Sequence, residues 1–319
     1  RVLSRGAPFR VQHRSGAARR MIEAPSNERP VWAERPSRTL AFAKFIVLLI
    51  TVALVMYPLV TVLSTSLSSE ADVQAAGGLV LFPHHPNFNA YRNILTHGII
   101  EHAVLVSLFI TVAGTAASLV VSVMMAYGIS RPIVGRRLII ILLLFSFLFP
   151  GGLIPTYLVV RSLHLLNNYM SLVLPTLTNA FSVIILQQFF MHGVPEELVD
   201  SARIDGASDW TILARITLPL SKGVIAVVAL LSAVAHWNAY IPALLYLNDN
   251  AMWPLSMILR LYASAGQGSP GQDIPPDLIA PPQSIVTAVI ILATVPILFV
   301  YPWLQKYFTR GVLSGALRG

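Results

Sequence analysis

Long apolar runs dominate the pattern of this chain, and short polar segments separate them. Six windows reach the roughly 20 apolar residues that a helix needs to cross a bilayer. They cover residues 41–64, 103–130, 138–160, 171–191, 223–247 and 284–303, and none of them contains Asp or Glu. The pattern predicts an all-α integral membrane protein with six transmembrane helices.

The composition agrees with a membrane protein. Only 11% of the side chains are charged and 55% are hydrophobic, whereas about a quarter of the residues are charged in a typical soluble domain. Because the chain has no cysteine, it can form no disulfide and no thiolate metal site. His84 and His85 lie between prolines, and this arrangement favours a turn over a metal site. We therefore expect no metal, and the Ser, His and Asp residues are too scattered to form a catalytic triad.

The basic residues fall on alternate polar segments. Nineteen of the 22 Lys and Arg side chains lie in residues 1–44, 131–137, 192–222 and the residues after 303. The segments between these hold only Arg92, Arg161 and Arg260. The positive-inside rule then predicts a multi-pass protein of the cytoplasmic (inner) membrane with both termini in the cytoplasm. The formal net charge of +8 reflects this topology and contact with membrane lipid, and it does not indicate nucleic acid.

Three regions follow from these patterns. Residues 1–40 are rich in Arg, Pro, Ser and Ala, which is typical of a flexible basic arm, here in the cytosol. Residues 41–303 form the six-helix transmembrane domain, with a cytosolic loop at 192–222. Residues 304–319 form a cytosolic tail.

The loop at 192–222 predicts two short helices joined by a bend. Proline followed by two glutamates starts the first helix, which runs from Glu196 to about Asp205, and Gly206 ends it. Ser208 or Asp209 can cap the second helix, which we expect to end before Leu218 and Pro219. On the first helix, Leu198, Ala202 and either Val199 or Asp205 share one face.

Two interpretations of this loop remain open on spacing alone. It is either a docking element for a cytosolic partner or an amphipathic segment that lies on the lipid surface.

A motif in the loop carries a resemblance to a known family. Asp200, Ser201 and Ala202 are followed by three residues and Gly206, then by nine residues and the stretch ITLP at 216–219. These spacings match the EAA motif of permease subunits from bacterial ATP-binding-cassette (ABC) importers, with Asp in place of Glu and Ser in place of Ala. The stretches FPGGLIPTYLVVRSLHLLNNYMSLVLPTL and WNAYIPALLYLND resemble carbohydrate importers too. From about residue 40 to 319, the chain is similar to the maltose-G-like subunit, in the lipoprotein-associated oligosaccharide branch.

The resemblance implies a type I ABC importer permease fold, in which ATP hydrolysis by partners drives alternating access. The implied partners are a second homologous permease subunit, two ATPase subunits, an extracytoplasmic sugar-binding protein and an oligosaccharide substrate. The residues implied to couple to the ATPases are Glu197, Asp200, Ser201, Ala202, Asp205, Gly206, Ile216, Leu218 and Pro219. The tail residues implied to reach the ATPases are Gly311, Gly315 and Gly319.

The chain itself lacks the residues for ATP hydrolysis. None of its three lysines follows a glycine, so it has no phosphate-binding loop of the GxxxxGK[ST] type. We expect a non-catalytic subunit without a cofactor, with ATP and Mg in the partner ATPases. The alternative is a secondary carrier that works alone, but such carriers usually keep acidic groups within the membrane, and the six windows contain none. A membrane scaffold without transport is a third possibility.

Polar side chains within the windows are candidates for the substrate path, because sugars are held by hydrogen bonds and aromatic faces. The candidates are Asn179, Gln187, Gln188, His236, Trp237, Asn238 and Tyr240. Hydrogen bonding between helices also explains each of them individually, since an unpaired polar group is costly in lipid. The stretch HWNAY at 236–240 gathers the most polar groups and is the strongest of these candidates.

Overall fold

The computed structural model describes residues 37–83, 85–96, 98–265 and 282–316, and this part of the chain is helical without strands. Most of the predicted arm at 1–40, together with His84 and Gly319, lies outside the described residues. The chain divides into two compact units, residues 1–56 and 57–319. The described residues of the first unit belong to the start of helix α1 (Arg38–Ser66), and the second unit contains all the other helices.

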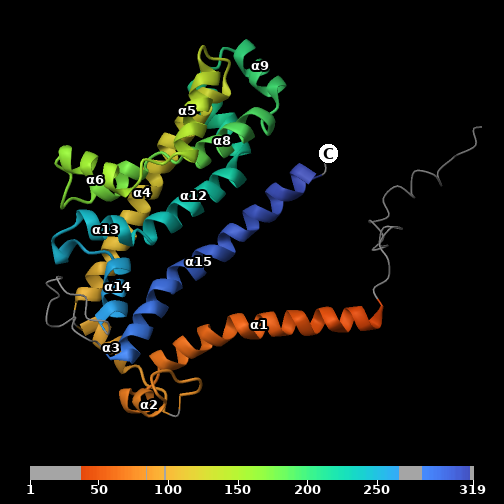
Figure 1. The fold of residues 1–319 in the computed structure, drawn as a ribbon. Coiled ribbons are helices and arrows are strands. Elements are labelled where there is room, and N and C mark those ends of the chain that lie inside the picture. The colour runs from red at the N-terminus through yellow and green to blue at the C-terminus, as the bar shows by residue number, and fades with distance from the viewer. Residues whose placement is uncertain (1–36, 84, 97, 266–281, 317–319) are drawn as a thin grey trace, which may run out of the picture. The chain divides into compact units, whose positions relative to one another are not determined.

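The second unit is built around one unbroken helix, α4 (Ile99–Ser130). Figure 1 shows α4 running through this unit beside α8 (Ala180–His192), α12 (Lys222–Trp237) and α14 (Leu255–Ala265). The other helices are α2 (Glu70–Ala75), α3 (Asn89–Thr96), α5 (Arg136–Leu148), α6 (Leu153–Ser162), α7 (Met170–Val173), α9 (Glu196–Ile204), α10 (Asp209–Ile212), α11 (Leu218–Leu220), α13 (Tyr240–Tyr246) and α15 (Gln283–Ala316). Short 3₁₀ turns lie at Leu174–Thr176 and Asn250–Met252, and a π-turn lies at Leu213–Thr217.

Two of the predicted spans are bent. The window at 138–160 divides into α5 and α6, which meet at an angle of 112° around the sequence FPGG. Gly152 there has a φ of +81°, which a side chain with a Cβ rarely adopts. The window at 171–191 bends by 49° between Met170–Thr176 and α8, where Pro175 interrupts the hydrogen-bond ladder. Each of these two windows therefore consists of two helical segments joined by a bend.

The window at 223–247 is also interrupted, between α12 and α13. Helix α12 ends at Trp237, and α13 starts at Tyr240. Pro242 lacks the N–H group that would bond to the carbonyl of Asn238 in a continuous helix, and its ring would collide with that carbonyl. The Asn238 carbonyl instead accepts a hydrogen bond from the Tyr240 N–H at 2.7 Å. Proline thus explains the break at this point.

The breaks affect the count of membrane crossings. Within the described residues, α1 and α4 are each long and apolar enough to cross a bilayer, and up to five crossings result if each bent helix pair counts as one. Residues Gln283–Phe299 of α15 add a shorter apolar helix. The count of six stays a prediction.

Helices α4 and α12 approach closely at Gly114 and His236. The His236 side chain is buried, and its Nε2 lies 3.2 Å from the Thr176 hydroxyl. Its Nδ1 lies 2.8 Å from the Ser232 carbonyl, which therefore accepts a hydrogen bond from that nitrogen. A Cβ atom at position 114 would come to 3.0 Å from Cγ of the imidazole and closer still to two other ring atoms. Only glycine at 114 leaves room for this histidine.

We expect Gly114→Ala to destabilise the protein, because the added methyl group overlaps a ring that two hydrogen bonds hold in place. Overpacking of this kind costs about 1–3 kcal/mol. The measurement is the thermal unfolding midpoint of the purified protein in detergent. Gly128→Ala is the matched control, since it lies in the same helix with no atom within 4 Å of the added Cβ. Equal midpoints for the two variants would contradict the steric explanation.

Candidate functional site

The loop predicted to be cytosolic folds into two short helices, as expected. Helix α9 begins at Glu196 directly after Pro195, and Glu196 and Glu197 occupy its first turn. Carboxylates are favourable there because the first turn of a helix carries a partial positive charge. Proline also suits this end, where no intrahelical partner is needed for its missing N–H.

Helix α9 ends at Gly206 in a Schellman turn. The Ala207 N–H donates to the Ala202 carbonyl at 2.9 Å, and the Gly206 N–H donates to the Arg203 carbonyl at 3.0 Å. Gly206 has a φ of +80°, and no atom lies within 4 Å of the position that a Cβ would take. The glycine is therefore required by the backbone conformation, while the space beside it is open.

The second helix starts as predicted but extends further. The Ser208 side chain accepts a hydrogen bond from the Thr211 N–H at 3.3 Å and so caps α10. The chain continues through the π-turn at Leu213–Thr217 into α11, so the expectation that the helix ends before Leu218 is wrong. The π-turn widens the backbone just before Pro219, which occupies the first turn of α11, where its missing N–H does no harm. The chain then bends by 83° into α12.

A small apolar cluster holds the two helices together. Val194, Val199 and Ile212 are buried, and Ala202 and Ile216 pack against them. Val199 is thus the residue that shares the inner face with Ala202. The prediction that Leu198 belongs to this face is wrong, since its side chain is 48% exposed.

The outer surface of this helix pair combines apolar and acidic side chains. Ile204 is 87% exposed and Trp210 is 67% exposed. Asp200 and Asp205 are also exposed. The sequence pattern placed Trp210 on the second helix but did not single out Ile204, because an isolated apolar residue gives no periodic signal. Exposed large apolar side chains in a polar loop are typical of an interaction surface.

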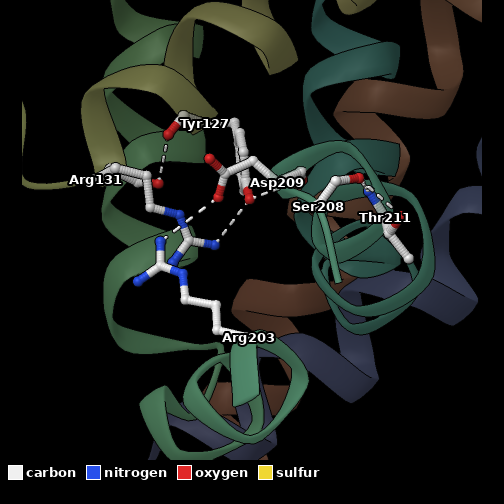
Figure 2. A network of polar contacts seen from close by, with 7 residues as sticks. Tyr127, Arg131, Arg203, Ser208, Asp209 and Thr211 are labelled. Carbon is white, nitrogen blue, oxygen red and sulfur yellow. Dashed lines mark hydrogen bonds and ion pairs between the residues drawn. The ribbon is translucent and has the colours of Figure 1, made fainter. Parts of the chain in front are cut away.

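The helix pair is attached to the end of α4 by a phenol and an arginine. The buried Tyr127 hydroxyl donates to the Asp209 carbonyl at 3.0 Å. Arg131 donates to the same hydroxyl at 3.1 Å, and its guanidinium lies 4.6 Å from the centroid of the Tyr127 ring. Figure 2 shows Tyr127 and Arg131 facing Asp209 at the start of α10. Tyr127 of α4 thereby fixes the first turn of α10.

These contacts differ in strength. A hydrogen bond between neutral groups contributes about 0.5–1.5 kcal/mol, and one to a charged group contributes about 1.5–3 kcal/mol. Arg203 and Asp209 form an ion pair at 3.5 Å, but both side chains are largely exposed, so solvent weakens this pair. The buried phenol therefore dominates the attachment.

A cavity of about 370 Å³ lies at the break between α12 and α13. Three of the predicted path residues, His236, Asn238 and Tyr240, line it together with Leu172 and Thr176. It combines hydroxyl, amide and imidazole groups with apolar walls. This is the chemistry that suits a neutral polar ligand.

The other predicted path residues lie elsewhere. The Asn179 side chain accepts from the Ser182 N–H at 3.3 Å and caps α8. Gln187 is buried and bonds to the sulfur of Met191, whereas Gln188 is exposed. Trp237 donates from its indole to the Ala293 carbonyl at 3.1 Å and borders a separate, mostly apolar cavity of about 400 Å³.

Comparison with known proteins identifies the family. The model of the family described as "Binding-protein-dependent transport system inner membrane component" matches residues 31–314. The chain belongs to this family. The resemblance found in the sequence is thereby confirmed.

Individual relatives support this family assignment. The "Polygalacturonan/rhamnogalacturonan transport system permease protein YtcP" of Bacillus subtilis (strain 168) is 43% identical over 275 residues, covering 85% of this chain and 96% of the relative. "Protein LplC" of the same organism is 43% identical over 269 residues, covering 84% and 90%. A solved chain from "a bacterial ABC transporter involved in the import of the acidic polysaccharide alginate" superimposes with a TM-score of 0.77 at 29% identity, covering 88% of this chain and 100% of that one. The all-helical architecture is that of an ABC transporter permease.

In this transport component, the residues of the predicted coupling motif divide into two groups. Ala202, Ile216 and Leu218 are half-buried, and they pack within the helix pair or against the bundle. The exposed residues are Glu197, Asp200, Ser201, Asp205, Gly206 and Pro219. The predicted tail residues Gly311 and Gly315 fall within α15. The first group therefore shapes the helix pair, and the second group is available to a partner.

We expect Tyr127→Phe to loosen the loop, since the variant keeps the ring but loses both hydrogen bonds of the phenol. Loss of about 1.4 kcal/mol of local stability corresponds to about tenfold faster amide hydrogen exchange. Exchange over residues 196–212, followed by mass spectrometry on the purified protein, measures this effect.

The matched control is Tyr91→Phe, which removes a phenol that lies 2.9 Å from the Ser66 hydroxyl, away from the loop. Tyr91→Phe should leave exchange at 196–212 unchanged. If both variants exchange alike over the loop, the phenol of Tyr127 does not hold it.

Proposed function

We propose that this chain is a permease subunit of an ABC importer that moves an oligosaccharide into the cytoplasm by alternating access. The observation that carries the proposal is the bent helix pair of α9 and α10, which presents acidic and apolar side chains and is bonded to the end of α4. Such an element can receive force from a separate ATPase and pass it to the membrane helices. ATP and Mg²⁺ would bind to the ATPase and not to this chain.

The charge of the loop favours docking over a position on the lipid surface. Residues 192–222 contain five acidic and three basic side chains, which gives a net charge of −2. Helices that lie on anionic membranes carry Lys and Arg on their polar face, and a negatively charged loop is repelled from such a surface. A protein partner with basic and apolar groups is the better match.

The exposed residues would make different kinds of contact with the ATPase. Asp200 and Asp205 would meet basic groups of the ATPase, and Ile204 and Trp210 would enter its apolar cleft. The open space beside Gly206 would let the partner approach the backbone closely. The tail residues Gly311, Gly315 and Gly319 are proposed as a second contact with the ATPases.

The proposed cargo enters through the cavity at the α12–α13 break. Its hydroxyl, amide and imidazole groups can bond to sugar hydroxyls, and breaks in membrane helices often line transport sites because they expose polar groups. Relatives are named for transport of polygalacturonan, rhamnogalacturonan and alginate. We therefore assign an oligosaccharide as cargo, delivered by an extracytoplasmic sugar-binding protein. A second permease subunit would complete the pore.

The secondary carrier is not favoured, given the family and the similarity to an ABC transporter. The proposed location is the cytoplasmic membrane, with both termini in the cytoplasm, as the distribution of basic residues indicates.

Uptake of an oligosaccharide into vesicles that contain the complete complex tests the proposal directly. We expect uptake to require ATP and the ATPase subunits together with the binding protein. Uptake by this chain without nucleotide would support the carrier instead.

We expect Gly206→Arg to reduce uptake and ATPase copurification by at least about tenfold, because a large side chain fills the open space at the proposed interface and loss of a central contact costs at least about 2 kcal/mol. The amount of protein in the membrane should stay the same. Gly135→Arg is the matched control, since Gly135 also lies in a polar loop, has a φ of +82° and has no atom within 4 Å of an added Cβ. Normal uptake by Gly206→Arg, or equal losses in both variants, would contradict docking at this position.

A further inference from the structure

An arginine lies beside the cavity at the α12–α13 break. Arg260 belongs to α14, and its guanidinium carbon is 5.8 Å from the centroid of the Tyr240 ring. Tyr240 is one of the residues that line the cavity. Helix α14 packs against α13, so the two side chains are held by neighbouring elements. The same aromatic ring thus contacts the cavity and an arginine.

Arg260 is available to a ligand. Its side chain is exposed, and within the described residues no carboxylate lies within ion-pair distance of it. An arginine over an aromatic ring retains N–H donors that can bind a carboxylate with two parallel hydrogen bonds.

The charge of a helix end does not explain the position of Arg260. Basic residues are disfavoured on the outer side of a membrane protein, where the distribution of charges puts this one. Arg161, another basic residue assigned to that side, occupies the last turn of α6, where it complements the helix dipole. Arg260 lies in the middle of α14 and has no such role.

The cavity walls contain no acidic residue. Thr176, His236 and Asn238 supply neutral polar groups, and the other lining residues are apolar or aromatic. A negatively charged ligand would therefore meet one positive charge and no negative one at this site. A neutral sugar lacks the carboxylate that could form two parallel, charge-assisted hydrogen bonds with the arginine.

We propose that Arg260 and Tyr240 form a subsite for a carboxylated sugar, a uronic acid unit of the oligosaccharide. This inference rests on the proposed function of oligosaccharide import. Tyr240 offers a flat face to the sugar ring, and Arg260 binds the carboxylate. The subsite distinguishes an acidic oligosaccharide from its neutral counterpart after the binding protein has released it.

Equilibrium binding to the purified complex, without the binding protein, tests the subsite. The probes are trigalacturonate and its methyl ester, which have the same backbone but differ in charge, and ligand-observed NMR measures both affinities. We expect the wild type to bind the acid more tightly than the ester. Arg260→Gln should weaken acid binding by about tenfold and leave ester binding unchanged. Arg260→Lys keeps the charge but loses the planar guanidinium group. Its affinity for the acid should therefore lie between those of the wild type and Arg260→Gln.

Arg161→Gln is the matched control, because it removes an exposed arginine that is not a lining residue of the cavity and does not lie over the Tyr240 ring as Arg260 does. It should bind both probes like the wild type. The inference is overturned if the wild type does not prefer the acid, or if Arg260→Gln and Arg161→Gln bind it equally. ATP-dependent uptake of a neutral oligosaccharide alone would leave the proposed function intact and still overturn the subsite, whereas ATP-independent uptake would count against the proposed function.

Discussion

The hydrogen bond from the Tyr127 phenol to the Asp209 backbone joins the helix pair of α9 and α10 to α4, and the arrangement of the second unit depends on α4. Further along α4, Gly114 receives the His236 ring of α12. Near its other end, the Ser107 hydroxyl accepts a hydrogen bond from the Leu255 N–H at the start of α14, at 2.8 Å. These contacts extend over about 30 Å of helix, since each residue adds about 1.5 Å.

Helix α4 is continuous, whereas α5–α6 and α12–α13 are broken, and the two kinds of helix differ in what they can do mechanically. Each interruption in α5–α6 and α12–α13 exposes backbone groups that a lipid environment cannot satisfy, so they must be paired within the protein or face water. Where the structure satisfies them, as at Asn238 and Tyr240, the break can also line a cavity. Helix α4 has no proline and transmits displacement along its axis, while the broken helices can change their angle.

Local patterns predicted the local structure well. Proline with two glutamates predicted the start of α9, and glycine predicted its end, because both signals act within one turn of helix. Hydropathy did not locate the breaks in the spans, since it measures apolar length and is insensitive to the backbone strain at FPGG or Pro242. The attachment of Tyr127 to Asp209 could not be predicted either, because the two residues are 82 positions apart and only the packing of the helices brings them together. The same reason applies to Arg260 and Tyr240.

The close fit of His236 against Gly114 connects the interface between α4 and α12 with the proposed transport site. His236 contacts α4 at this glycine and also lines the cavity, so one side chain belongs to both the helix interface and the proposed transport site. Since closely packed interiors deform little, a displacement of α4 relative to α12 must move this ring or be blocked by it. Movement of the ring would break its contact with Thr176 and change the polar wall of the cavity. A force that enters through Asp209 can therefore reach the polar groups of the proposed transport site through a single helix and a single side chain.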